Sequence, residues 1–372
     1  MSAAEEKDYD SIRSGIEKSC ILTYKPEKCY PGYTLFSNYK GNTFYLIDME
    51  GNVVHTWQVR MAKVGEILPN GHLMYGHMWN GVAEIDRQSK ELWYYKCSQH
   101  HDFAVLASGN VMILCGLEGW GFPPRPVWEK RLGPEIREGG LHATTYFIEV
   151  DPRKNERVWE WRSDEHIDEL KEIGIKFPVE LYEPFHSNTC EVLPQTKLGE
   201  KDERFKPGNV VFSHRNLNVV GVIEKRSGEI VWAWGPGELD RQHMPTLIPD
   251  VHPITNEPMP GAGHFLIFDN GTHRGYSRIV ELDPLTEKIV WEYKAPGFFG
   301  SWGAGQDRMP NGNTLISEGG TRGRLFEVTP QGEIVWEYLT PYFDGRGEHA
   351  IYRCVRYPAE YIKDMQKKET SQ

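Results

Sequence analysis

The chain has 372 residues, of which 39% are hydrophobic and 26% are charged, and its formal net charge is −11. This composition is typical of a folded globular protein, and the negative charge argues against binding to nucleic acid or to an anionic membrane. No run reaches the roughly 18 apolar residues of a membrane span, and the N-terminal MSAAEEKDYDSIRSG lacks the features of a secretory signal. The six cysteines lack CxxC spacing. We therefore expect free thiols and a cytoplasmic location.

The first strands are predicted soon after the N-terminus. Residues 1–31 show no repeat and are assigned to an N-terminal arm. Residues 32–59 then contain three short segments, GYTLFS, TFYLIDM and VVHTWQV, which are rich in aromatic and β-branched residues. Such segments, separated by turn residues, are typical of β-strands.

A strand that carries tryptophan recurs six times along the chain. The six residues are Trp57, Trp93, Trp159, Trp232, Trp291 and Trp336. Most are preceded by a second recurring feature, a Leu-Pro-Asn-Gly type of turn, as in Leu68-Pro-Asn-Gly-His and Met309-Pro-Asn-Gly-Asn. In two copies an insertion separates the Leu/Ile-Pro from the Gly, at 193–209 and at 248–264. Each repeat therefore predicts four short strands, with glycine in the first hairpin turn.

Six such repeats predict an all-β fold, a six-bladed β-propeller with four-stranded blades over residues 32–361. The first blade has only three strands at the N-terminal end. We expect the last strand, at 350–357, to complete it and so to close the ring, with residues 362–372 as a tail. Two insertions interrupt the repeat: residues 117–142 are loop-like, and residues 164–182 have the apolar spacing of a short helix.

Polar residues gather where the innermost strands of the blades begin. Candidate residues are His101 in the third blade, His186 and Asn188 in the fourth, Arg215 after the second strand of the fourth, and His243 in the fifth. His101 and His243 both lie five residues before the Leu or Ile of the turn motif, which indicates equivalent positions. Because innermost strands line the channel of a propeller, we expect these side chains to share one cavity.

Several segments resemble the bacterial arylsulfotransferase (aryl-sulfate sulfotransferase) family. They are HSNTCEVLP, FSHRNLNVVGVIEKRSGEIVWAWG, RQHMPTLIP with HFLIFDNG, MPNGNTLISEGG and the closing Arg356-Tyr357-Pro358. The resemblance runs from about residue 32 to residue 361 and implies a six-bladed propeller. It also implies transfer of a sulfuryl group from an aryl sulfate to a phenol, without a nucleotide donor or other cofactor.

The resemblance assigns roles to the candidate residues. It places the nucleophile, which forms a sulfohistidine, at His243. The H-x-N motif falls on His186 and Asn188, the Arg-Asn motif on Arg215, and the remaining histidine on His101. Elementary chemistry agrees, because neutral imidazole is a competent nucleophile and a guanidinium fork suits an oxyanion. The expected ligands are small aryl sulfates and phenols; the oligomeric state is not predicted.

Two other functions remain open from the residues alone. His101, His186 and His243, with His100 or Asp102, could hold a divalent metal ion in a lyase or hydrolase, since three imidazoles suit Zn, Mn or Fe. Alternatively, the propeller could be a binding platform without catalytic activity.

Overall fold

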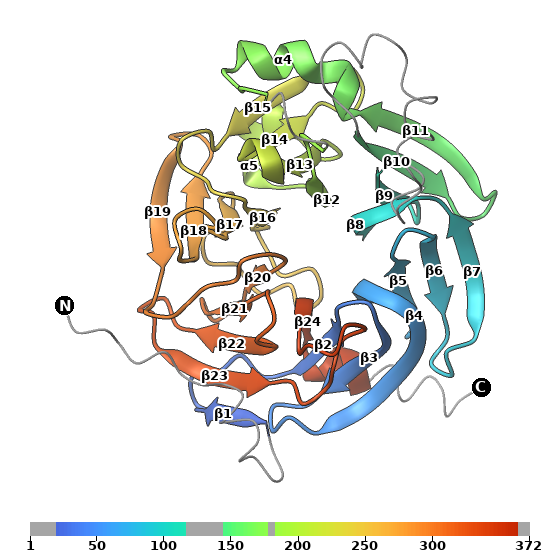
Figure 1. The fold of residues 1–372 in the computed structure, drawn as a ribbon, viewed down its shortest axis with the longest axis vertical. Coiled ribbons are helices and arrows are strands. Elements are labelled where there is room, and N and C mark those ends of the chain that lie inside the picture. Colours follow the sequence, from blue (N-terminus) through green and yellow to red (C-terminus); the bar gives the residue numbers. More distant parts are fainter. Residues whose placement is uncertain (1–19, 117–143, 178–182, 364–372) are drawn as a thin grey trace. The chain divides into compact units, whose positions relative to one another are not determined.

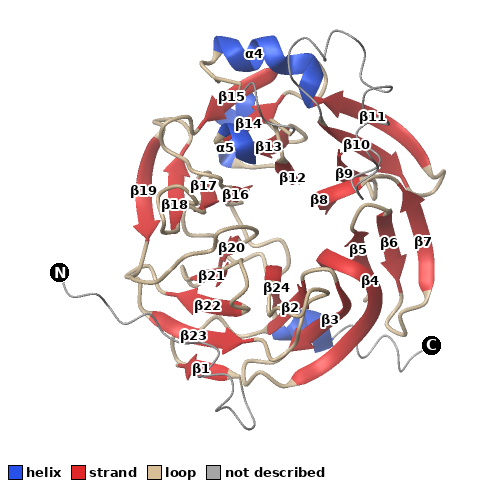
Figure 2. Cartoon of the chain, in the orientation of Figure 1, coloured by secondary structure: helices blue, strands red, loops and turns tan. Residues whose placement is uncertain are grey.

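The computed structural model describes residues 20–116, 144–177 and 183–363. Almost all of the regular structure in them is antiparallel β-sheet, with a few short helices (Figures 1 and 2). The chain divides into two compact units: unit 1 comprises Met1–Tyr75, Ala83–Leu92 and Thr246–Gln372, and unit 2 comprises Gly76–Val82 and Trp93–Pro245. The predicted insertion at 117–142 lies outside the described residues.

Unit 2 contains two four-stranded sheets. The strands of the first are β8 (Gln99–Val105), β9 (Val111–Gly116), β10 (Thr145–Asp151) and β11 (Glu156–Arg162), and those of the second are β12 (Ser187–Val192), β13 (Val210–His214), β14 (Val219–Ile223) and β15 (Ile230–Trp234). In each sheet the strands lie in chain order and pair antiparallel. Strands β8 and β12 lie side by side (Figure 1). The backbone N–H of Cys190 donates to the Asp102 carboxylate over 2.9 Å, which joins these two strands.

Short helices occupy the connections of unit 2. They are η2 (Ser163–His166), α4 (Ile167–Glu172), α5 (Lys197–Lys201), η3 (Glu203–Phe205) and η4 (Arg215–Leu217); Figure 2 draws α4 and α5 in blue. The helix predicted within 164–182 is confirmed as η2 and α4. It is anchored by Leu170, which is fully buried with Trp161 and Phe185, and by Glu169, whose carboxylate accepts a hydrogen bond from the N–H of Ile230.

The other strands form three sheets. One consists of β16 (His243–Leu247), β17 (Phe265–Asp269), β18 (Arg278–Asp283) and β19 (Lys288–Tyr293); another of β20 (Gly305–Arg308), β21 (Thr314–Ser317), β22 (Arg324–Val328), β23 (Ile334–Leu339) and β1 (Ile21–Tyr24). The seven-stranded sheet has β24 (Ile351–Tyr357), β2 (Tyr33–Asn38), β3 (Gly41–Ile47), β4 (Val53–Ile67), β5 (Leu73–His77), β6 (Gly81–Ile85) and β7 (Glu91–Lys96), in that order. The division between the units passes through β5, β6, β7 and β16.

The last strand pairs with the first predicted strand, as the sequence indicates. Strand β24 runs antiparallel to β2, with Leu35 opposite Val355, and both lie in unit 1 (Figure 1). Strand β4 is longer than predicted, because the segment that carries Trp57 continues without a break into the next predicted strand. Met61, with φ of 47°, marks the junction within it.

Part of the predicted N-terminal arm forms a strand. Strand β1 pairs antiparallel with β23, with Tyr24 opposite Trp336, and adds a fifth strand to that sheet. Four residues are too few to show an alternating pattern, so this pairing could not be predicted from the sequence alone.

The predicted hairpin turns share one hydrogen-bonding pattern. In the first, the N–H of Gly71 donates to the carbonyl of Leu68, and the N–H of Leu68 donates to the carbonyl of His72. The pattern recurs at Leu106/Gly109, Leu193/Gly208, Ile248/Gly263 and Met309/Gly312. The glycine has a φ between 83° and 91° in every case, which a side chain would disfavour. The two insertions therefore lengthen the loop without changing how the turn closes.

The six repeated tryptophans all lie on strands, as predicted: β4, β7, β11, β15, β19 and β23. Three of them donate their indole N–H to a backbone carbonyl in a turn of another sheet in the same unit. The pairs are Trp159 to Lys225 (3.0 Å), Trp291 to Pro330 (2.8 Å) and Trp336 to Met49 (2.9 Å). At these three positions the tryptophan therefore fastens one sheet to another as well as packing against it.

The six cysteines are free thiols in the structure. Among the helices of the described residues, none combines the length and the apolar character needed to cross a membrane.

A buried ion pair connects both ends of the described chain within unit 1. Arg356 on β24 and Glu327 on β22 form an ion pair, and both side chains are 0% exposed. The Glu327 carboxylate also accepts from the N–H of Tyr30 (2.7 Å) and from the amide of Asn313 (2.6 Å). The Arg356 guanidinium also donates to Thr34 on β2 (3.1 Å). Every charge in this network therefore has partners, as burial requires.

We expect the substitution Arg356→Ala to lower the free energy of unfolding by about 3–5 kcal/mol, because it leaves the Glu327 carboxylate buried without its cation. Urea denaturation followed by circular dichroism measures this. The matched control is Lys25→Ala, which removes an exposed partner of Glu333 and should cost at most about 1 kcal/mol. Equal losses in the two variants would contradict the structural role of the buried pair.

Candidate functional site

The candidate site lies in unit 2, where the chain enters β8, β12 and β16. Residues with left-handed backbone conformations concentrate at these entries: His101 (φ 68°), His186 (φ 43°), Arg241 (φ 62°) and Met244 (φ 47°). This conformation is unfavourable for residues other than glycine, and such strain is often found at functional sites.

Three imidazole rings meet between β8 and β12. The Nε2 atoms of His101 and His186 lie 3.1 Å apart, a hydrogen-bond distance that requires one nitrogen to carry the proton and the other to accept it. The ring of His100 lies 4.0 Å from that of His101 and 5.3 Å from that of His186, measured between centroids. Trp79 packs against His100 at 5.0 Å. The structure thus brings together His101 and His186, as predicted, and adds His100.

A buried carboxylate supports these histidines. Glu183 is 8% exposed and hydrogen-bonds the Nδ1 atom of His186. Its other carboxylate oxygen lies 3.9 Å from the Nε2 of His100. A carboxylate at Nδ1 fixes the tautomer and the orientation of the ring. Glu183, His186 and His101 therefore form a continuous chain along which a proton can be held or passed.

The backbone corrects the predicted equivalence of His101 and His243. His243 follows the buried Gln242 and precedes a left-handed residue, Met244. On β8 the corresponding residue is His100, which likewise follows a buried glutamine, Gln99, and precedes a left-handed residue, His101. Counting back from the turn motif failed because β8 contains a bulge: Gln99 pairs with Cys115 and Phe103 with Ile113, so β8 has more residues than β9 between these pairs. The bulge shifts the histidines of β8 relative to His243.

Asn188 joins the His186 strand to the segment that leads to His243. Its side-chain amide donates to the backbone carbonyl of Gln242 over 2.8 Å, and its carbonyl oxygen accepts from Thr189. Gln242 in turn donates to the carbonyl of Val219 over 2.9 Å. His243 itself is 1% exposed. Asn188 thus holds the backbone directly before His243.

Arg215 contacts the backbone of His186 and shares a hydrogen-bond acceptor with a second arginine, Arg241. The backbone N–H of Arg215 donates to the carbonyl of His186 (3.4 Å), and its guanidinium donates to the side-chain oxygen of Asn216 (3.0 Å). The guanidinium of Arg241 donates to the same oxygen. The side-chain amide of Asn216 donates to the carbonyl of Glu183 over 2.7 Å. Two cationic groups therefore converge on Asn216, whose amide in turn contacts the segment that leads to His186.

The three clustered histidines could also bind a metal ion. Each of His100, His101 and His186 offers a ring nitrogen, and these atoms lie within 4.8 Å of one another. The carboxylate of Glu183 at Nδ1 of His186 is the arrangement found behind many metal-bound histidines. Among the described residues, the set that forms is therefore His100, His101 and His186, whereas the sequence indicated His243 as the third ligand.

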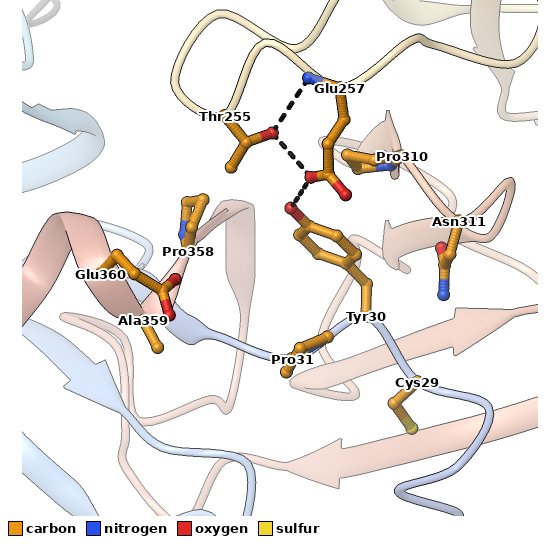
Figure 3. A pocket seen from close by; sticks show the side chains of 10 residues that line it. All are labelled: Cys29, Tyr30, Pro31, Thr255, Glu257, Pro310, Asn311, Pro358, Ala359 and Glu360. Carbon is orange, nitrogen blue, oxygen red and sulfur yellow. Dashed lines mark hydrogen bonds between the residues drawn. The ribbon is translucent and has the colours of Figure 1, made fainter.

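Unit 1 has a pocket of about 500 Å³ with different chemistry. Figure 3 shows the hydroxyl groups of Tyr30 and Thr255 directed at the carboxylate of Glu257, to which they donate over 2.9 and 2.7 Å. These hydrogen bonds lower the pKa of Glu257. The lining includes neither histidine nor arginine, so this pocket lacks the groups that the chemistry predicted from the sequence requires.

A family model described as Arylsulfotransferase (ASST) matches residues 69–340, a span that contains every residue of the candidate site. The chain belongs to the arylsulfotransferase family.

Comparison with solved structures gives only distant similarity. A protein of unknown function from Bacteroides caccae aligns with a TM-score of 0.54 and 14% identity, over 87% of this chain and 98% of the other. The WD40 domain of Toxoplasma gondii coronin (TM-score 0.46, 10% identity, 87% and 71%) and the WD40 β-propeller domain of Doa1 (0.45, 10%, 89% and 91%) are more distant. No curated protein matches the sequence.

Four groups at the site of this arylsulfotransferase-family chain were not among the catalytic candidates that the sequence indicated: His100, Glu183, Asn216 and Arg241. His100 and Asn216 are sequence neighbours of the predicted His101 and Arg215, and Arg241 lies two residues before His243. Including every polar residue within two positions of a predicted one would have found these three. Glu183 lies in a connection without periodicity, and only the fold brings its carboxylate to His186.

His214 is a buried histidine with a structural role. Its Nδ1 lies 2.8 Å from the Ser187 hydroxyl, and its ring packs against Phe212 and Phe185 at 4.3 and 5.2 Å. Burial among these groups lowers its pKa to about 3. The folded protein therefore keeps His214 neutral, whereas the unfolded chain protonates it near its ordinary value of about 6.5.

We expect the His214 contribution to stability to be fully present above pH 6.5 and to be lost as the pH falls towards 3, because only the unfolded state gains the proton there. Between pH 7 and pH 5 the loss should be about 2 kcal/mol. Urea denaturation at both pH values should show a smaller drop for His214→Asn than for wild type. His273→Asn, at an exposed position, is the control, and an unchanged drop in His214→Asn would refute this assignment.

Proposed function

We propose that this chain is an arylsulfotransferase that moves a sulfuryl group from an aryl sulfate to a phenol through a sulfohistidine at His243. The family membership supports this reaction class. The single observation that carries the proposal is the convergence of Arg215 and Arg241 on Asn216, beside the Glu183–His186–His101 chain. Together these residues offer cations for the sulfuryl oxygens and a proton donor for the leaving group.

The proposed reaction has two balanced steps. A ring nitrogen of His243 attacks sulfur, the bond from sulfur to the aryl oxygen breaks, and the phenolate leaves with a proton from the imidazolium form of His101, which becomes neutral. The oxygen of an acceptor phenol then attacks sulfur, the bond from sulfur to nitrogen breaks, and the phenol proton returns to the neutral His101. Transfer of this kind depends mainly on positioning and on electrostatic stabilisation of the equatorial oxygens.

The remaining site residues have supporting roles in this proposal. Asn188 positions the segment that carries His243 through its hydrogen bond to Gln242. Arg215 binds the sulfuryl oxygens, because a guanidinium presents a planar fork of donors. Trp79, which packs on His100, provides an aromatic surface for the aryl group. No nucleotide donor or other cofactor takes part.

The same proposal includes a six-bladed ring over residues 32–361, between an N-terminal arm (1–31) and a C-terminal tail (362–372). It is supported by the six Trp-bearing strands and by the 15-residue length of β4. If β4 serves as the outer strand of one blade and the inner strand of the next, the seven-stranded sheet supplies two blades. The pairing of β24 with β2 then supplies the closing strand.

Intact mass spectrometry after mixing with a chromogenic aryl sulfate tests the reaction. We expect one added sulfuryl group per chain in wild type and none in His243→Ala, because the variant lacks the nucleophile. Turnover with a phenol acceptor should fall by at least ~10³-fold in His243→Ala, as when other catalytic nucleophiles are removed.

The control for this experiment is His273→Ala, at an exposed position in unit 1, which should keep both the adduct and the turnover. Peptide mapping locates the added group. An adduct on His186 rather than His243, or full turnover in His243→Ala, would overturn the assignment of the nucleophile.

A second candidate function is a metal-dependent lyase or hydrolase. It is favoured by the cluster of His100, His101 and His186, which would hold the ion, with Glu183 orienting His186. A bound divalent ion would supply a Lewis acid or an activated water. The two arginines close by disfavour this candidate, because a further cation would repel them.

Chelation separates the two candidates. We expect treatment with EDTA to leave sulfuryl transfer unchanged, because the proposed steps use only side chains. Elemental analysis of the purified protein gives an independent readout. One divalent ion per chain that is lost in His186→Ala but kept in His243→Ala, together with inactivation by EDTA, would establish the metal candidate instead.

A further inference from the structure

Arg241 is a half-buried cation that forms no ion pair with the described residues, although the carboxylate of Asp240 lies nearby. Within the described parts of the chain, the hydrogen bond from its guanidinium to the Asn216 amide oxygen is the only polar contact that its side chain makes. Burial lowers its pKa, and the nearby Asp240 only partly offsets this effect. A guanidinium that has lost water without gaining an anion is unfavourable unless a ligand supplies the negative charge.

The backbone holds Arg241 in this position at a cost. Its φ of 62° lies in the left-handed region, and its N–H donates to the side-chain oxygen of Asn218 over 2.9 Å. Asn218, with φ of 55°, itself ends the short helix η4 that begins at Arg215. Strain of this kind persists where the surrounding structure imposes it, commonly at binding sites.

Asn216 sets the spacing between the two guanidinium groups. Its single side-chain oxygen accepts from both Arg215 and Arg241, so the two groups lie within the reach of one small ligand. Asn216 is fixed at its other end, because its amide donates to the Glu183 carbonyl and its backbone N–H donates to the carbonyl of Phe185. Two like charges held at this distance repel each other, and an anion bound between them would offset this repulsion.

We propose that Arg241 and Arg215 form a two-arginine clamp for one oxyanion, and that Arg241 is a substrate-binding residue for the sulfuryl group. The inference rests on the proposed function for its substrate, but the clamp itself predicts binding of a free tetrahedral anion. One planar fork can donate to two oxygens of a tetrahedral anion, and a second fork can reach the oxygens that the first leaves free. Inorganic sulfate is therefore the simplest probe of the clamp.

Thermal unfolding with and without sodium sulfate tests the clamp without relying on turnover. Sodium chloride at matched ionic strength corrects for screening, and Arg226→Gln, at an exposed position of the β14–β15 turn, corrects for the general stabilising effect of sulfate. We expect wild type and Arg226→Gln to show the same sulfate-dependent rise in Tm. Arg241→Gln should show only the rise caused by general exclusion of sulfate. Arg241→Lys, which keeps the charge but not the fork, should fall between them.

Steady-state kinetics then connects the clamp to the reaction. In Arg241→Gln we expect kcat/KM for the aryl sulfate to fall by about 10²-fold, as when one preorganised donor to a developing anion is removed. Arg226→Gln should keep wild-type values. A measured Tm in the absence of sulfate establishes that each variant is folded before it is compared.

The outcomes distinguish this inference from the proposed function. One outcome supports the clamp and contradicts sulfuryl transfer. In it, wild type forms no sulfohistidine, and the sulfate-dependent rise in Tm is present in wild type and absent from Arg241→Gln. If the adduct forms and Arg241→Gln matches wild type in both sulfate response and kcat/KM, the clamp is wrong and the reaction stands. A wild-type response no larger than that of Arg241→Gln also overturns the clamp.

Discussion

The packing of one sheet on another depends on the tryptophans of the repeated strands, which contact a neighbouring sheet. A single four-stranded antiparallel sheet exposes two faces and cannot bury both by itself. Trp159 and Trp291 lie on the edge strands β11 and β19, and Trp336 lies on β23 beside the edge strand β1. Each of these rings packs towards a second sheet, and its N–H donates to a turn carbonyl there. At the opposite edges of the two sheets of unit 2, strands β8 and β12 carry polar candidate residues instead.

This division explains what the sequence could and could not predict. The tryptophan strands and the Gly-containing turns could be predicted because each occurs several times in the sequence. Gly71 and the corresponding glycines of the other turns adopt the expected positive φ. The four-residue strand β1 occurs once and could not be predicted. At the candidate site, residue types indicated His101, His186 and Arg215, but the bulge in β8 misaligned the histidines. The contribution of Glu183 depends on a connection whose path no periodicity defines.

The candidate site joins groups from segments far apart in the sequence through backbone contacts rather than through loops that wrap a ligand. Asn188 contacts the carbonyl before His243, and Arg215 contacts the carbonyl of His186. The left-handed residues at His101, His186 and Arg241 mark where the chain departs from regular strand geometry to aim these side chains. Each departure costs free energy on the order of 1–3 kcal/mol, and the buried strands around it provide the compensation. Preorganisation of this kind reduces the reorganisation that binding and reaction would otherwise require.

Two guanidinium groups and one carboxylate are joined by the hydrogen bonds of Asn216 and His186, and Asp240 adds a negative charge near Arg241. The guanidinium groups can donate to an oxyanion. A divalent cation would instead have to approach Glu183 against repulsion from Arg215 and Arg241. The Nε2 atoms of His101 and His186 lie at a hydrogen-bond distance of 3.1 Å, so a proton on one of these nitrogens can by itself hold the two rings together.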